Sequence, residues 1–374
     1  MFDEFGPEKI LEIYDAKTGM HGFVVIDNTA RGPGKGGIRM TPTVTLDEVA
    51  KLARVMTWKT SLADLPFGGA KAGIISPKDL TLEKKKKIIE AFSRALKVIS
   101  PKLYIAAPDI NTAEKEMKWF AEANGDWRSC TGKPSSMCTK VGKSKKCGIP
   151  HEYGSTGFGV YHATLVAAPF AGLDIKKSTV AVEGLGNVGS FAAKYLSKNA
   201  NTKVVAVSDS KGLIYNKDGL DIAKLLEVKK KTGSVINYKP GQILDNKKVT
   251  KLPVDILITA AIPDVIKKED ILSVKAKMIV EGSNIPISEE VEETLHKRGI
   301  LVVPDFVANA GGVISSYAEY RGKSPRDMFK LVKQKIKKNT KLVLELAKKK
   351  KCKPRNAAVE IAMSRVREAM KGMK

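Results

Sequence analysis

Three lysines in the first fifth of the chain stand where a charged side chain is poorly solvated. Lys35 lies within the stretch RGPGKGGIR, and Lys71 lies between FGGA and AGII. Lys59 continues the apolar helical spacing of Leu52 and Met56. Such surroundings disfavour the ammonium form and should lower a lysine pKa from about 10.4 toward neutrality. A lysine that loses its proton near pH 7 can serve in acid–base chemistry or as a nucleophile.

The alternative for any single lysine is that its stem packs along apolar surface while its ammonium reaches water. Three such lysines within 37 residues make this alternative less attractive.

Asp109 is the candidate acidic partner of these lysines. It follows the strand-like run 103–107 in LYIAAPDINTAE and precedes a helix that Asn111 could cap, with Glu114 three residues later. Its carboxylate could exchange protons with a lysine or serve only as a second helix-capping group. The residues alone leave both roles open.

A glycine-rich turn in the second half of the chain predicts a dinucleotide site. In VEGLGNVGSFAAKYL, Gly184, Gly186 and Gly189 follow a β-branched run and precede an apolar helical segment. Gly184 would permit the tight turn, Gly186 the approach of backbone to a pyrophosphate, and Gly189 close packing of helix on strand. Asn187 and Val188 complete the candidate coenzyme contacts of this turn. A merely structural glycine turn is the alternative.

The residues leave the choice between NAD and NADP open. Asp209 ends the next strand, twenty positions after Gly189, where it could accept hydrogen bonds from the ribose 2′-hydroxyl of NAD. Ser208, Ser210 and Lys211 flank Asp209 and could instead hold the 2′-phosphate of NADP.

Small or polar residues also follow the later strands of this half. Because ligands bind beyond the carboxyl ends of parallel strands, these residues are expected to line one crevice. They include Ala260 after one strand and Asn284 after the next.

The elements that must position these residues follow two different sequence patterns, one in each half of the chain. Helical signals dominate the first hundred residues, whereas from about Thr179 short β-branched runs alternate with helices. The alternation is typical of a parallel, doubly wound sheet. We therefore expect an α/β chain with an N-terminal α/β substrate-binding domain over 1–154 and a Rossmann-type dinucleotide-binding domain over 155–342. The helices of 343–374 could pack back on the first domain.

Length and composition agree with a two-domain globular protein, since 374 residues with 43% hydrophobic side chains exceed the usual single core. No apolar run has the length of a membrane span, and the start MFDEFGPEKI is mixed and acidic. A soluble, cytoplasmic protein is expected. The four cysteines match no zinc pattern and are expected to be reduced thiols.

The net charge of +25 raises a nucleic-acid hypothesis. From Tyr320 onward nineteen Lys and Arg stand against four acidic residues. Such a field attracts polyanions. These lysines nevertheless lie outside a helical apolar stripe, and no aromatic residues alternate with them as base-stacking platforms would. A solvated surface is therefore favoured, and nucleic acid is not an expected partner.

Taken together, the motifs resemble those of the glutamate, leucine, phenylalanine and valine dehydrogenase family, and within it those of the glutamate-specific members. The resemblance runs from about Asn28 to the C-terminal helices, in the family's order. The segments that carry it are NTARGPGKGGIRM, MTWKTSLADLPFGGAKAGI, AAPDINT, GSTGFGV, EGLGNVG, VEGSN and PDFVANAGGVISSYAE.

This resemblance implies a role for each matching residue. Lys71 would be the catalytic lysine of low pKa and Asp109 the proton-transferring carboxylate. Lys59 would hold the substrate α-carboxylate, and Lys35 the side-chain carboxylate of glutamate. The remaining implied contacts are Ser316 and Val313 to the substrate, and Thr156 and Asn284 to the nicotinamide and its ribose.

Two departures from the family pattern bear on assembly and coenzyme contacts. Only about 27 residues precede NTARGP, so the hexamer that the family favours is less certain than a homo-oligomer in general. In GIPHEYGSTGFG this chain has Glu152 and STG where the family often has an arginine and ATG.

The resemblance therefore implies reversible oxidative deamination of L-glutamate to 2-oxoglutarate and ammonia with NAD or NADP. A dehydrogenase of branched-chain or aromatic amino acids is the alternative within the family, although such enzymes carry an apolar residue where Lys35 stands. A nucleic-acid-binding protein on a dinucleotide-binding scaffold is the non-enzymatic alternative. No metal site is expected.

Overall fold

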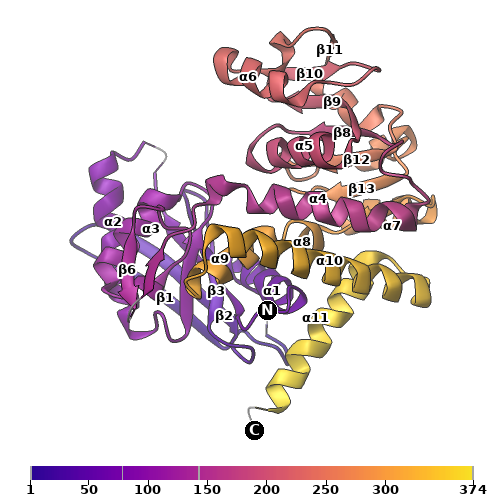
Figure 1. The fold of residues 1–374 in the computed structure, drawn as a ribbon. Helices are drawn as coiled ribbons and strands as arrows, with labels where there is room; N and C mark the ends of the chain where they lie inside the picture. Colours follow the sequence, from indigo (N-terminus) through magenta and orange to yellow (C-terminus); the bar gives the residue numbers. More distant parts are fainter. Residues whose placement is uncertain (1, 78, 142–143, 373–374) are drawn as a thin grey trace. The chain divides into compact units, whose positions relative to one another are not determined.

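The computed structural model describes residues 2–77, 79–141 and 144–372, and it divides the chain into two compact units (Figure 1). The helices α9 (Gly311–Tyr320), α10 (Pro325–Lys350) and α11 (Pro354–Lys371) each contribute residues to both units. Unit 1 comprises Met1–Tyr153, Val313–Leu331 and Val359–Lys374, and unit 2 comprises Gly154–Gly312 and Val332–Ala358.

A five-stranded mixed sheet forms the centre of unit 1, with strand order β1-β2-β4-β3-β5. The strands β3, β4 and β5 are parallel, whereas β1 and β2 run antiparallel to their neighbours. The bounds are β1 Lys9–Asp15, β2 Met20–Asn28, β3 Gly34–Thr41, β4 Gly68–Ile75 and β5 Tyr104–Pro108.

Helices cover both faces of this sheet, and the alternation of side chains along β2 shows how. Val24 packs in the core with residues of α2 (Leu82–Ala95) and α3 (Glu114–Asn124). Its neighbour Val25 points to the opposite face and packs with residues of α1 (Leu46–Leu62). Successive side chains of a strand point to opposite faces, so one apolar run serves two cores.

The expectation that helices dominate the first hundred residues is wrong, because β1 to β4 lie there. Glycines weaken the strand pattern of β3 and β4, yet close backbone approach requires at least one of them. A β-carbon at Gly36 would stand 1.7 Å from the carbonyl oxygen of Ala70. The glycines that obscure the strands thus permit their packing.

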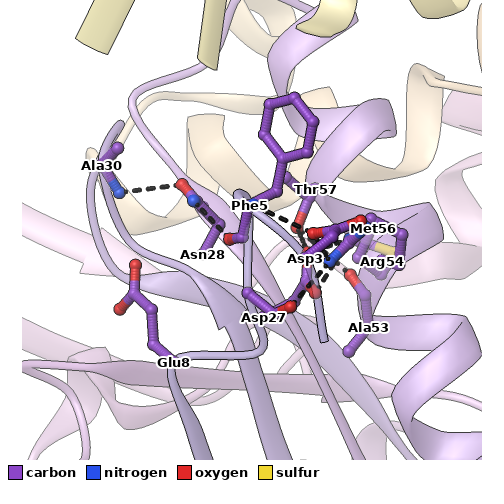
Figure 2. A network of polar contacts seen from close by, with 12 residues as sticks. Asp3, Phe5, Glu8, Asp27, Asn28, Ala30, Ala53, Arg54, Met56 and Thr57 are labelled. Atoms are coloured by element: carbon purple, nitrogen blue, oxygen red, sulfur yellow. Dashed lines mark hydrogen bonds and ion pairs between the residues drawn. The ribbon is translucent and has the colours of Figure 1, made fainter. Parts of the chain in front are cut away.

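A polar network fastens α1 to β2 (Figure 2). Nε of Arg54 donates to both carboxylate oxygens of the buried Asp27 at 2.9 Å, and the Thr57 hydroxyl donates to the same carboxylate. Arg54 also pairs with Asp3, so the start of the chain is held against the helix. The network fixes the helix that carries Lys59 on the sheet that carries Lys71.

Unit 2 is built on a seven-stranded sheet of order β11-β10-β9-β8-β12-β13-β14. The strands β9, β8, β12, β13 and β14 are parallel, as expected for a doubly wound sheet, and β10 and β11 add an antiparallel edge. The bounds are β8 Thr179–Glu183, β9 Lys203–Asp209, β10 Gly212–Tyr215, β11 Gln242–Leu244, β12 Ile256–Thr259, β13 Met278–Glu281 and β14 Leu301–Val303.

Five helices of unit 2 connect or flank these strands. The central residues of the parallel strands are apolar because helices lie over the sheet, and Ala181, Leu257 and Ile279 share one buried cluster. The helices are α4 Ser155–Ala167, α5 Asn187–Ala200, α6 Ile222–Thr232, α7 Glu289–Lys297 and α8 Asp305–Ala308.

Cys138 and Cys147 form a disulfide, so the expectation of four reduced thiols is wrong for this pair. They lie directly opposite one another on the short antiparallel strands β6 (Cys138–Val141) and β7 (Ser144–Cys147). Cross-strand proximity of this kind depends on hairpin register, which cysteine spacing alone did not reveal. Cys130 and Cys352 are free.

No helix within 2–77, 79–141 and 144–372 combines the length and the apolar character needed to cross a bilayer.

Candidate active site

Lys71 and Asp109 lie side by side in unit 1. Nζ of Lys71 is 2.8 Å from Oδ2 of Asp109, and both side chains are largely buried. Lys71 lies on β4, and Asp109 directly follows β5. Burial lowers the pKa of Lys71, although the Asp109 carboxylate opposes this effect. The sheet thus presents an amine and a carboxylate in direct contact, a pairing suited to proton transfer.

Arg39 completes this cluster, although its sequence surroundings had predicted no role for it. Its Nε donates to Oδ2 of Asp109 at 3.0 Å, and its guanidinium also pairs with Glu48 of α1. Burial alone would raise the pKa of Asp109, but Lys71 and Arg39 together hold it below its usual value. One signal was available: Arg39 lies four residues after Lys35 in one strand, so both point to the same face.

The helix-capping alternative for Asp109 does not hold. The helix α3 begins at Glu114, with Ala113 as its N-cap residue, rather than after Asn111. The backbone N–H of Ala113 donates to the Glu116 carboxylate, and the Asn111 amide donates to the carbonyl of Met40. Asp109 is instead engaged by the two cations.

Lys35 is 1% exposed, which makes it one of the largest fully buried side chains described. Its Nζ donates to the carbonyls of Ala106 at 2.7 Å and Ile105 at 3.3 Å. Burial lowers the pKa of Lys35 to about 7, and the nearby positive charges of Lys133 and Lys71 act in the same direction. The ammonium therefore lies in a water-poor environment, and a small change in pH around 7 changes its protonation.

A buried ion pair borders Lys35, and sequence reasoning missed it. Nζ of Lys133 lies 2.6 Å from Oε1 of Glu319 on α9, and both side chains are 0% exposed. The other Glu319 oxygen accepts from the backbone N–H groups of Gly132 and Ile149. These contacts fasten α9 to the loop segments on either side of the β6–β7 hairpin.

Ser316 and Val313 lie on the same helix as Glu319. Val313 is buried and Ser316 is partly buried, one helical turn before Glu319. Because residues three apart share a helix face, Ser316 belongs to the side of α9 that carries Glu319.

Lys59 flanks the buried face of α1 rather than lying on it. The most buried positions of α1 include Val49, Ala53 and Thr57, while Lys59 in the last turn is partly buried. Burial lowers the pKa of His151, and the Lys59 charge adds to this effect. The Lys59 ammonium therefore lies close enough to the segment before α4 to act on it electrostatically.

In unit 2, Gly184, Gly186, Asp209 and Ser210 line a cavity of about 630 Å³. Gly186 is the N-cap residue of α5, without a side-chain cap, so backbone N–H groups of the first turn lack that partner. Helix N-termini of this kind favour anions such as a pyrophosphate. The cavity and the helix start therefore suit a dinucleotide.

The three glycines of the turn differ in what they require. Gly184 has a φ of +85°, and a β-carbon at Gly189 would stand 1.9 Å from the Gly184 carbonyl oxygen. Around Gly186, by contrast, no described residue other than its chain neighbours has an atom within 4 Å of a β-carbon position. Turn geometry thus explains Gly184, helix–strand packing explains Gly189, and Gly186 leaves the backbone open to approach.

Other predicted coenzyme residues lie outside the described lining of this cavity. Asn284 accepts from the amide of Asn309 at 2.9 Å, and Thr156 is buried at the start of α4. Ala260 donates its N–H to the carboxylate of Glu183, a buried residue of the cavity wall that the sequence analysis did not consider. The further residues in this group are Asn187, Val188 and Gly189.

Asp209 is held by its own loop. Its Oδ1 accepts from the Lys211 N–H at 2.9 Å and from the Ser234 hydroxyl at 3.1 Å. Its Oδ2 accepts from the Val235 N–H at 2.8 Å. The carboxylate therefore stabilises the turn from β9 to β10 and the start of the 3₁₀ segment Val235–Asn237.

In the described part of the chain, no group of three or more His, Cys, Asp or Glu is placed to hold a metal ion.

A parallel sheet whose first strand leads through a glycine turn into a helix, with a cavity beside that turn, defines a Rossmann-type dinucleotide-binding architecture. Residues 147–373 match Glutamate/Leucine/Phenylalanine/Valine dehydrogenase, and residues 7–125 match the Glu/Leu/Phe/Val dehydrogenase dimerisation domain. The chain belongs to this family, and it is an amino-acid dehydrogenase.

Named relatives agree with this membership. The chain is 43% identical over 307 residues to a glutamate dehydrogenase of Thermotoga maritima, covering 80% of this chain and 72% of that one. It is 42% identical over 368 residues to a glutamate dehydrogenase of Aeropyrum pernix, covering 92% and 84%. The crystal structure of a hetero-hexameric glutamate dehydrogenase from Thermus thermophilus superposes with a TM-score of 0.84 at 29% identity, covering 98% and 90%.

Proposed function

We propose that the protein catalyses the reversible oxidative deamination of L-glutamate to 2-oxoglutarate and ammonia, with NAD or NADP as coenzyme. The observation that carries the proposal is the contact of Lys71 with Asp109 on a sheet face that also bears Lys35. The glutamate dehydrogenases among the relatives support the same substrate.

Substrate recognition requires cations for two carboxylates. In this proposal Lys59 holds the α-carboxylate common to all amino acids, and Lys35 holds the side-chain carboxylate. Ser316 adds a hydroxyl donor, and Val313 packs against the substrate stem. A carboxylate in a water-poor site needs such partners because an unpaired buried charge is strongly disfavoured.

The chemistry divides into oxidation and hydrolysis. A bound nicotinamide coenzyme supplies the acceptor for the hydride that leaves Cα. Water then adds to the resulting imine, and ammonia leaves as the carbonyl forms. Lys71 in its amine form accepts the proton of the attacking water, and Asp109 moves protons between the carbinolamine hydroxyl and the departing nitrogen. The lowered pKa of Lys71 favours the amine form that this role needs.

The two units divide these tasks in the proposal. Unit 1 binds the amino acid through its lysines, and unit 2 holds the coenzyme. Gly184, Gly186, Asn187, Val188 and Gly189 form the turn for the pyrophosphate, with Asp209 and Ser210 near the adenosine ribose. Thr156, Ala260 and Asn284 contact the nicotinamide half.

We further propose that the protein works as a homo-oligomer. Support comes from the match of residues 7–125 to a dimerisation domain, and the hetero-hexameric Thermus thermophilus relative supports assembly in general. Light scattering coupled to size exclusion would give the mass directly, and a 40.6 kDa particle would contradict this assembly.

Absorbance at 340 nm tests the function, with NAD and NADP each offered against a panel of amino acids. L-Glutamate should give the highest kcat/KM. A preference for leucine, valine or phenylalanine would replace glutamate by another substrate of the family. No amino-acid-dependent reduction with either coenzyme would refute the proposal.

A further inference from the structure

The cavity beside the glycine turn is lined by charged residues near the end of β9, where the adenosine ribose of a dinucleotide would bind. In dinucleotide-binding folds an acidic residue at the end of the second strand receives the ribose 2′-hydroxyl, whereas a nearby cation accommodates a 2′-phosphate. The chain carries both kinds of residue here. The preference for NAD or NADP therefore depends on whether the acidic residue or the cation is free to bind the ribose 2′ substituent.

The acidic residue is largely occupied. Asp209 already accepts hydrogen bonds from two backbone N–H groups and one hydroxyl, and its side chain is 7% exposed. An ammonium also approaches it, since Nζ of Lys229 is 3.9 Å from Oδ2. The positive charge of Lys229 therefore opposes the repulsion that the Asp209 carboxylate would exert on a further anion.

Lys229 supplies the cation. It lies in the last turn of α6, its side chain is 27% exposed, and its Nζ donates to the Leu185 carbonyl at 2.7 Å. That bond places the ammonium between the glycine turn and the end of β9. An ammonium has three N–H donors, so one bond to Leu185 leaves donors for a ligand.

Lys211 does not occupy the corresponding position. Although it is two residues from Asp209, its ammonium lies against Gly233, 3.7 Å from where a β-carbon would stand. It is not part of the described cavity lining, whereas Lys229, Lys247 and Ser210 are. The sequence pointed to Lys211 and not to Lys229, because the helix that brings Lys229 back to β9 is not visible as a local pattern.

Further charged residues line the cavity. Lys251 is one of them, and it is paired with Asp270 at 3.0 Å. Lys247, by contrast, is exposed at the start of the 3₁₀ segment Asn246–Lys251, whose neighbour Asn246 donates to the carbonyl of Asp209. Lys229 and Lys247 thus come from separate elements and both line the cavity that contains Asp209 and Ser210.

We propose that Lys229, assisted by Ser210 and Lys247, receives the 2′-phosphate of NADP, so that the enzyme prefers NADP over NAD. This inference rests on the proposed function for the identity of the coenzyme site. It concerns binding only, and it can be tested without turnover.

The test measures binding of NADPH and NADH by coenzyme fluorescence, with no amino acid present. The wild type should bind NADPH at least tenfold more tightly than NADH, because a phosphate gains charge-assisted hydrogen bonds. Lys229→Met, which keeps the apolar stem, should weaken NADPH at least tenfold and change NADH less than threefold. Lys211→Met is the matched control and should change neither.

A second probe separates the ribose site from the rest of the coenzyme. Adenosine 2′,5′-bisphosphate should displace NADPH better than AMP does, and Lys229→Met should abolish that advantage. Equal weakening of NADPH and NADH would show that Lys229 only supports the Leu185 turn, and a wild type that binds NADH as tightly as NADPH would overturn the proposal. Selective NADPH binding without glutamate turnover would instead refute the proposed function and leave this inference standing.

Discussion

Oδ2 of Asp109 is shared by two cations, with Nζ of Lys71 at 2.8 Å and Nε of Arg39 at 3.0 Å. The three residues come from the parallel strands β3 and β4 and from the end of β5. Lys71 and Arg39 lower the pKa of the Asp109 carboxyl, while burial lowers the pKa of the Lys71 amine. An amine whose pKa is lowered by burial, in direct contact with an ionised carboxylate, is an arrangement suited to proton transfer.

Removing either proton-transfer group should stop catalysis while sparing coenzyme binding. Lys71→Ala and Asp109→Asn should each lower kcat by roughly two to four orders of magnitude, the usual range for an acid or base. Steady-state rates and coenzyme fluorescence measure the two effects. Lys51→Ala, an exposed lysine of α1, is the control and should behave as wild type. Near-normal rates in either active-site variant would remove that residue from the mechanism.

Arg39 should act as a positioning residue through Asp109. Replacing it in Arg39→Gln removes one of the cations that lower the pKa of Asp109, so that pKa should rise. The acidic limb of the pH profile of kcat/KM should then move to higher pH. Arg31→Gln, which removes a guanidinium paired with Asp64, provides the comparison. An unshifted profile in Arg39→Gln would show that Arg39 only stabilises the fold.

The selectivity for glutamate should depend on pH through Lys35. Its pKa of about 7 means that the ammonium is present below this pH and is lost as pH rises through it. The ratio of kcat/KM for glutamate to that for norvaline should therefore fall above about pH 7. Lys133, Lys71, Glu319 and Cys130 also face this ammonium, so a flat ratio in Lys35→Leu is needed to assign the effect. A glutamate-to-norvaline ratio that does not change with pH in the wild type would contradict this role of Lys35.

Thiol titration should distinguish two classes of cysteine. In denaturant without reductant, two thiols should react, from Cys130 and Cys352, and four should react after reduction. In the double variant Cys138→Ser, Cys147→Ser, the count should be two under both conditions. Four reactive thiols in the unreduced wild type would show that the disulfide is absent.

The sequence predicted features whose determinants are local. The five parallel strands of unit 2 appear as β-branched runs, and the turn at Gly184 carries its own spacing. The contact of Lys71 with Asp109 was also foreseeable, because each lies in a charge-poor or strand-end setting.

What the sequence could not predict depends on tertiary contacts. Glu319 is 186 residues from Lys133, and no local pattern connects them. Lys229 reaches the end of β9 only because α6 folds back, and Asp209 is engaged by a segment 26 residues later. The strands of unit 1 were obscured by glycines that close packing demands, which is why helices seemed to dominate there.

In the proposed function Lys35 recognises the side-chain carboxylate of glutamate, and the sharpest test is the steady-state kinetics of Lys35→Leu on glutamate, norvaline and leucine at saturating coenzyme. The variant should lose about a hundredfold or more in kcat/KM on glutamate, about 3 kcal/mol of transition-state binding. Activity on norvaline and leucine should be unchanged or improved, because an unpaired charge leaves their pocket. Lys59→Ala should lower all three substrates alike. A parallel loss of all three in Lys35→Leu would contradict the account.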